Sequence, residues 1–225
     1  MDTSSARTPS AADRVYTYVK DGITSRRFLG DELLGEGQIA AELGVSRTPV
    51  REGLLRLESE GLLRLLPKRG ALVLPVTAAE IEDVLETRRL LEDFAIRKVV
   101  HRSDRGNVVA ELDAHILEMR AAMSAKDTVS YVAADRAFHA AVVAAAGNAI
   151  LTRLYASLRD RQLRMGVANL LDAGGGQRDA AARMRTTLRE HQAIRDAIAD
   201  GSVRAAVAAA SEHLDGTQAL LGARR

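Results

Sequence analysis

Residues 39–57 read "IAAELGVSRTPVREGLLRL", and this stretch decides the fold of the region around it. Ile39 belongs to the apolar face of a short helix, and Gly44 can adopt the left-handed conformation that ends such a helix. Ser46 is a residue type that caps the start of a second helix, and Pro49 is tolerated in its first turn. Three apolar residues of this second helix recur at helical spacing and are expected to face inward: Val50, Leu54 and Leu57. Two short helices joined by a tight turn are typical of a helix–turn–helix.

The outer face at the start of the second helix carries Arg47, Thr48 and Arg51. In a helix–turn–helix, these positions reach base edges and phosphates in the major groove. Between residues 44 and 70, six Lys and Arg residues stand against three Glu residues, whereas the whole chain has a net charge of only +2. Cations matched to phosphates give salt-dependent affinity through counterion release. The stretch predicts a DNA-binding domain, and the alternative is a small helical domain with a solvated charged face.

Residues 62–76, "LLRLLPKRGALVLPV", contain two short runs rich in leucine and valine that are separated by "PKRG". This pattern predicts a small β-hairpin, or wing, with a basic tip formed by Lys68, Arg69 and Gly70. We expect this tip to lie against an adjacent groove or against the DNA backbone. Helices complete the predicted domain within residues 11–28, at 36–43 and at 47–60.

The pattern changes after Val76, where long helical segments begin. Thr77 is a good N-cap, and the acidic Glu80 follows three residues later. The predicted helices span about 78–100, 104–125, 127–146, 149–171, 179–199 and 202–222. The sequence has no Cys and only 3% aromatic residues. Disulfides and thiolate metal sites are therefore excluded, and the core must come from Leu, Val, Ile and Ala.

The fold class is therefore mostly α, and the chain divides into three parts. We expect a disordered tail at residues 1–10, a winged helix–turn–helix DNA-binding domain at 11–76, and an all-α six-helix bundle at 77–225.

The alanine-rich segment "AADRAFHAAVV", residues 133–143, places Asp135 and His139 one helical turn apart on an apolar face. His191 and His213 also occupy core positions of amphipathic stripes, on the last two predicted helices. At a rise of ~1.5 Å per residue they lie about 14 and 18 Å from the turn that joins these helices, roughly level with each other. Three helices can thus bring one carboxylate and three imidazoles to one region.

Buried polar groups need partners, and four inward side chains can satisfy one another around a cation. Imidazole suits Zn, Ni, Cu and Fe, and the carboxylate also admits Mn. We expect a divalent metal ion, Zn, Ni or Mn above all, with positions left for water or a ligand oxygen, at these four residues: Asp135, His139, His191 and His213. The alternative is that each is a hydrogen-bonded core residue. His101 and His115, near a helix end and in a mixed polar helix, are assigned no role.

The segments "GVSRTPVREGLLRLESEGLL" and "PKRGALV" closely resemble the GntR family of bacterial transcription regulators, over residues 11–76. The resemblance implies that operator DNA is contacted by Arg47, Thr48, Arg51 and Gly70.

Three positions depart from the family pattern. Leu29 replaces a usual proline, and Gly35 replaces the usual serine, so that the N-cap of the second helix is weaker. Gly37 stands where many members carry a basic residue that reads bases. This last departure bears on the operator sequence and leaves the binding mode unchanged.

The remainder, about residues 78–222, is similar to the FCD effector-binding domain of the FadR-like subfamily. The similar segments are "ETRRLLEDFA", "DRAFHAAVVAAAGN", "EHQAIRDAIADG" and "EHLDG". The resemblance places the family's metal ligands at Asp135, His139, His191 and His213. It also makes Arg88 the arginine that often pairs with an acidic effector. Six helices indicate the VanR-like branch, and the histidine set disfavours an acyl-CoA effector.

We therefore expect a cytoplasmic transcription regulator, resembling repressors, that binds a pseudo-palindromic operator as a homodimer and responds to a small organic acid. Residues 1–10 show no apolar core of a signal peptide, and no apolar run approaches the ~20 residues that span a bilayer, so we expect no membrane partner. One alternative is a metal-sensing regulator, in which the ion is the signal. The other is a metalloenzyme, which we disfavour because no general base stands beyond the ligands.

Overall fold

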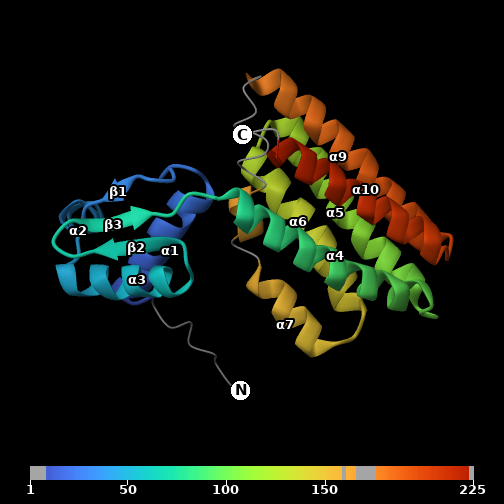
Figure 1. Ribbon diagram of the computed structural model, residues 1–225, viewed down its shortest axis with the longest axis horizontal. Coiled ribbons are helices and arrows are strands. Elements are labelled where there is room, and N and C mark those ends of the chain that lie inside the picture. The colour runs from blue at the N-terminus through green and yellow to red at the C-terminus, as the bar shows by residue number, and fades with distance from the viewer. Residues whose placement is uncertain (1–8, 159–160, 166–175, 223–225) are drawn as a thin grey trace, which may run out of the picture. The chain divides into compact units, whose positions relative to one another are not determined.

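The computed structural model describes residues 9–158, 161–165 and 176–222, and the chain forms two compact units, Met1–Val76 and Thr77–Arg225 (Figure 1). The first eight residues of the predicted tail lie outside the described residues. The end of the predicted helix 149–171 and the first part of the break predicted at 172–179 lie outside them as well. The rest of that break is helical, because α9 begins at Gly176 and not at about residue 179.

The first unit combines three helices with a three-stranded antiparallel sheet. Its elements are α1 (Ala11–Thr24), β1 (Leu33–Leu34), α2 (Glu36–Leu43), α3 (Arg47–Ser59), β2 (Leu63–Leu66) and β3 (Gly70–Val73). The sheet order is β1-β3-β2, so the predicted hairpin of β2 and β3 is confirmed. The strand β1 was not predicted, because two residues are too short to show an alternating pattern.

The helix–turn–helix forms as the sequence predicts, with one difference. Gly44 ends α2 in the left-handed conformation, at φ 61°. Ser46 has the extended backbone of an N-cap, but its side chain makes no capping hydrogen bond. Gly53 allows α1 to approach α3 closely, since a Cβ there would lie 2.8 Å from Val15 Cγ1. The core of this unit lies between α1, α3 and the sheet, and it includes the predicted residues Val50, Leu54 and Leu57.

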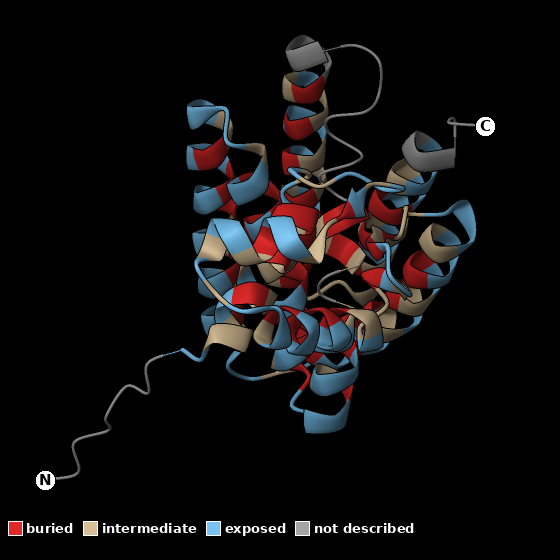
Figure 2. Ribbon diagram, turned by 90° about the vertical axis from the view of Figure 1, so that its left-hand side faces the viewer, coloured by how far each residue is buried: buried red, intermediate tan, exposed pale blue. Residues whose placement is uncertain are grey.

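The second unit is a helical bundle. Its helices are α4 (Ala78–Val100), α5 (Arg105–Ala125), α6 (Thr128–Ala145), α7 (Ala149–Ser157), α9 (Gly176–Ala199) and α10 (Val203–Gly222). Helix α4 packs against α6 and α10, α5 packs against α6 and α9, and α9 packs against α10, so that five helices close a ring. Helix α7 packs on α6 and α4. In Figure 2 the helices carry buried residues on one side and exposed residues on the other.

Most of these helices begin at a polar N-cap residue whose side chain accepts a hydrogen bond from the first turn. The Thr77 side chain accepts a hydrogen bond from Glu80 N, as predicted, and Asp127 and Asn148 cap α6 and α7 in the same way. The prediction of one helix over 149–171 is wrong, because α7 ends at Ser157. The N–H of Leu158 bonds to Tyr155 O, which tightens the last turn, and residues 161–165 are again helical. No helix in the described part of the chain is long and apolar enough to cross a membrane.

Gly70 provides a test of the sheet. Its φ is +116°, and a Cβ at this position would lie 2.2 Å from the carbonyl oxygen of Leu34 in β1. Gly70→Ala should therefore destabilise the protein by about 1–3 kcal/mol or more. Gly37→Ala is the control, because a Cβ there meets nothing closer than Arg47 Nη2 at 3.8 Å and Ala favours a helix by about 0.5–1 kcal/mol. Urea unfolding followed by circular dichroism measures both, and equal midpoints would contradict the role of Gly70.

Candidate DNA-binding surface and metal centre

The outward face of α3 presents the predicted DNA-binding residues. Arg47, Thr48 and Arg51 are all exposed. The Nε of Arg51 lies 3.0 Å from Oε1 of Glu36, so a carboxylate on α2 holds this guanidinium. Because the Ser46 side chain does not cap α3, the first N–H groups of this helix are not bonded to it. Uncapped N–H groups and exposed arginines are what phosphate oxygens require.

The tip of the wing is basic but not uniform. Lys68 and Arg69 are exposed, and Lys68 has a left-handed backbone at φ 62°. Gly70 is buried beside β1. The side chains that the wing offers to a nucleic acid are therefore those of Lys68 and Arg69, whereas glycine at position 70 is required by the sheet itself.

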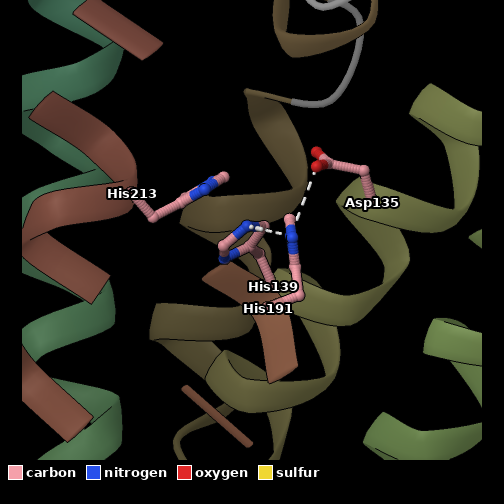
Figure 3. Close-up of side chains that lie close together, drawn as sticks. All are labelled: Asp135, His139, His191 and His213. Carbon is pink, nitrogen blue, oxygen red and sulfur yellow. Dashed lines mark hydrogen bonds and ion pairs between the residues drawn. The ribbon is translucent and has the colours of Figure 1, made fainter. Parts of the chain in front are cut away.

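The predicted cluster in the bundle is brought together. Figure 3 shows Asp135 and His139 of α6 facing His191 of α9 and His213 of α10. One ligand atom from each of the four side chains lies within 4.8 Å of the other three. The rings of His191 and His213 have centroids 4.6 Å apart, which agrees with the equal depth expected from the sequence.

Each histidine has an acceptor at its Nδ1 atom. His139 Nδ1 lies 3.0 Å from Glu92 Oε2, and His213 Nδ1 lies 2.9 Å from Glu190 Oε2. His191 Nδ1 lies 2.7 Å from the carbonyl oxygen of Thr187. Carboxylate and carbonyl oxygens only accept hydrogen bonds, so each neutral imidazole carries its proton on Nδ1. The three Nε2 lone pairs are therefore free to point into the middle of the cluster. Metal-binding histidines are oriented in the same way, by a hydrogen bond from their other ring nitrogen.

The separations of the ligand atoms fit a cation. His139 Nε2 and His191 Nε2 are 3.0 Å apart, and His191 Nε2 is 3.2 Å from Asp135 Oδ1. Two donors that bind one ion at about 2.1 Å, at a right angle, lie about 3.0 Å apart. Without a proton or a cation between them, the two nitrogens would face each other as acceptors. One carboxylate and three imidazoles therefore form a ligand set for a divalent transition metal.

Burial keeps two of these imidazoles, those of His191 and His213, uncharged. It lowers the pKa of His191 to about 3, against the opposing effect of Asp135, and it lowers the pKa of His213 to about 3. Burial alone would raise the pKa of Asp135, but His191 and the other histidines outweigh it and the pKa is lowered. At neutral pH the cluster thus has an ionised carboxylate on Asp135 and available nitrogen lone pairs on His191 and His213, as metal binding requires.

Arg88 lies deep in the bundle, next to a residue that the sequence interpretation missed. The Nε of Arg88 lies 2.7 Å from Oε1 of Glu92, which also accepts a hydrogen bond of 2.6 Å from the hydroxyl of Tyr155. The Nη2 atom of Arg88 is buried and has no hydrogen-bond partner within the described residues. Glu92 follows Arg88 by four residues in "ETRRLLEDFA", and this helical spacing was the signal that could have revealed it.

The two histidines that were assigned no role lie elsewhere. His101 is exposed at the C-cap of α4, and His115 lies 3.0 Å from the exposed Glu118 on its own helix.

The fold and these two regions define a class of protein: a winged helix–turn–helix joined to a helical bundle with a buried cluster of metal-binding residue types. Comparison with family models gives the family. Residues 11–73 match the gntR family of bacterial regulatory proteins, and residues 83–216 match the FCD domain. The chain belongs to the GntR family of bacterial regulatory proteins and carries an FCD domain. It is a DNA-binding transcription regulator and not an enzyme, as the sequence predicts.

Individual relatives agree. A regulator of the helix–turn–helix type from Agrobacterium vitis, in the TAR-I ttuE-ttuC' intergenic region, is 36% identical over 145 residues, which is 64% of this chain and 83% of that protein. The gluconate operon transcriptional repressor of Bacillus subtilis is 30% identical over 150 residues, 67% of this chain and 61% of its own. A GntR crystal structure from Rhodococcus sp. RHA1 has a TM-score of 0.78 at 24% identity, covering 95% of this chain and 99% of that one, which shows the fold alone.

The cluster generates a prediction about metal binding. Adding Zn²⁺, Ni²⁺ or Mn²⁺ to metal-free protein should raise its unfolding temperature, because a ligand at 100 times its Kd stabilises the folded state by about 2.7 kcal/mol. His191→Ala should abolish the shift for the same metal. His115→Ala is the matched control and should keep it, since His115 lies outside the cluster. A shift that survives His191→Ala, measured by differential scanning calorimetry, would place the ion elsewhere.

Proposed function

We propose that this regulator is a repressor whose bundle holds a divalent metal ion and responds to a small organic acid. The observation that carries the proposal is the convergence of three imidazole nitrogens, each fixed by a separate acceptor, on one carboxylate oxygen. Zn, Ni and Mn suit this ligand set best. The relative named as a repressor of a gluconate operon supports both the repressor and an acid as the signal.

The acid would bind by two contacts. The metal ion held by Asp135 and the three histidines would attract a carboxylate or hydroxyl oxygen of the acid, and Arg88 Nη2 would donate a hydrogen bond to a carboxylate oxygen. The second contact would give Arg88 Nη2 a hydrogen-bond partner. This stabilises the protein, because a buried charged donor without a partner lowers the stability of the folded state. Sugar acids and hydroxy acids carry both kinds of oxygen on one small molecule, and they are the class of effector we propose.

At the other end, a homodimer would place two copies of α3 on the half-sites of a pseudo-palindromic operator. Arg47, Thr48 and Arg51 would reach bases and phosphates, and Lys68 and Arg69 of the wing would contact an adjacent groove or backbone. The acid changes operator affinity only if it binds the DNA-bound and free states unequally. A protein with this role acts where the DNA is, in the cytoplasm.

Arg47 tests the DNA-binding face. Arg47→Ala should weaken binding to an operator selected from random duplexes by about 1–3 kcal/mol if the guanidinium contacts a guanine. Arg56→Ala is the control on the same helix, because Arg56 lies in the last turn and pairs with Asp13 at 2.7 Å. Fluorescence anisotropy measures both variants. Equal affinities of the two variants would remove Arg47 from the recognition of bases.

A second experiment separates the acid from the metal as the signal. Metal-loaded protein on its operator is titrated with a panel of sugar acids and hydroxy acids, before and after chelation. We expect one of the acids to release the DNA, and both chelation and His191→Ala to abolish this response. Release by the metal alone would favour the metal-sensing regulator, and an acid response that survives chelation would contradict the metal bridge.

A further inference from the structure

Glu92 is the one carboxylate of the described bundle that contacts both a histidine of the cluster and the arginine proposed for the acid. Its Oε2 lies 3.0 Å from His139 Nδ1, and its Oε1 lies 2.7 Å from Arg88 Nε. Only 2% of its surface is exposed, so no solvent competes with these contacts. Donors face both of its oxygens, since Tyr155 also donates its hydroxyl proton to Oε1 at 2.6 Å.

These contacts have two structural consequences. Because an ionised carboxylate can only accept, Glu92 keeps the proton of His139 on Nδ1 and turns the Nε2 lone pair toward the other ligands. Glu92 also accepts a hydrogen bond from Arg88 Nε, so this part of the guanidinium is occupied. The Nη2 atom of Arg88 has no partner in the part of the chain that the structure describes, and it stays available to a ligand.

We propose that Glu92 is a positioning residue shared by the metal site and Arg88, so that the charge of Arg88 sets how tightly the cation is held. The proposal rests on the proposed function, since it requires that Asp135 and the three histidines bind a divalent ion. One buried carboxylate, that of Glu92, contacts both Arg88 and His139, so the positive charge of Arg88 lies close enough to oppose a cation in the cluster. Glu92 lies between the two charges and neutralises part of each.

This arrangement predicts the direction in which two substitutions change the affinity for the metal ion. In Glu92→Gln, an amide N–H₂ group faces either His139 Nδ1 or the donors of Arg88 and Tyr155, so one donor must face another. If it faces His139, the imidazole shifts its proton to Nε2 and stops being a ligand. Arg88→Met has the opposite effect, because the repelling charge is gone and the full charge of Glu92 acts on the imidazole and the ion.

The experiment measures Ni²⁺ binding to the metal-free full-length chain by isothermal titration calorimetry. Glu92→Gln should weaken the affinity ten- to a hundredfold, the usual effect of losing such a partner of a ligand. Arg88→Met should tighten it. Glu118→Gln is the matched control, because it removes a carboxylate that lies 3.0 Å from His115 on the surface, and its affinity should equal that of the wild type.

The outcomes separate the proposals. If the wild type binds no Ni²⁺, the proposed metal site fails and this inference fails with it. If the wild type binds but Glu92→Gln matches Glu118→Gln, only the role of Glu92 is overturned. Weaker binding in both Glu92→Gln and Arg88→Met would show that the pair acts through folding alone. Should Glu92→Gln not fold, as judged by circular dichroism, Arg88→Met still decides, because tighter binding supports the proposal and weaker binding overturns it.

Discussion

Polar side chains buried inside a bundle must find their partners there, and this requirement organises the second unit. Burying an ion pair is costly, and a pair such as Arg88 and Glu92 is weak evidence for stability, because apolar residues of similar volume often serve as well. The pair nevertheless lies beside an imidazole of the cluster, and a tyrosine hydroxyl donates a further hydrogen bond to Glu92. A polar network of this kind is best understood as the support of a binding site, in which each acceptor fixes the direction of one nitrogen.

The DNA-binding unit depends on a different constraint, the close approach of backbones. Gly53 lets α1 pack on α3, and Gly70 lets β1 pair with the wing. With the apolar residues of α3 turned inward, Arg47 and Arg51 have only the outer face left to occupy. Close packing at these glycines thus shapes the unit, and the cations on its outer face are the ones that we propose contact phosphates.

Much of this could be predicted from the sequence, because helical periodicity and cap residues are local signals. The helix at 36–43, the left-handed Gly44 and the cap at Thr77 need no information beyond a few neighbours. The approach of His191 and His213 could also be predicted, since a short turn sets two antiparallel helices level. The spacing of Glu92 from Arg88 is a local signal too. Its contacts with Tyr155 and His139 could not be predicted, because these residues lie far from it in sequence, and the strand β1 exists only by pairing with β3.

Helix α4 is the element of the bundle that follows the DNA-binding unit in the chain. It begins at Ala78, directly after the first unit ends at Val76, and it carries both Arg88 and Glu92 into the bundle. Arg88 lies ten residues from Ala78, about 15 Å along the helix at ~1.5 Å per residue. A continuous helix transmits a displacement over this distance without melting, whereas a loop would absorb it. In the proposed regulator, an acid that binds Arg88 would therefore act on the helix that leads to the DNA-binding unit, and the same helix carries Glu92, the carboxylate that holds Arg88.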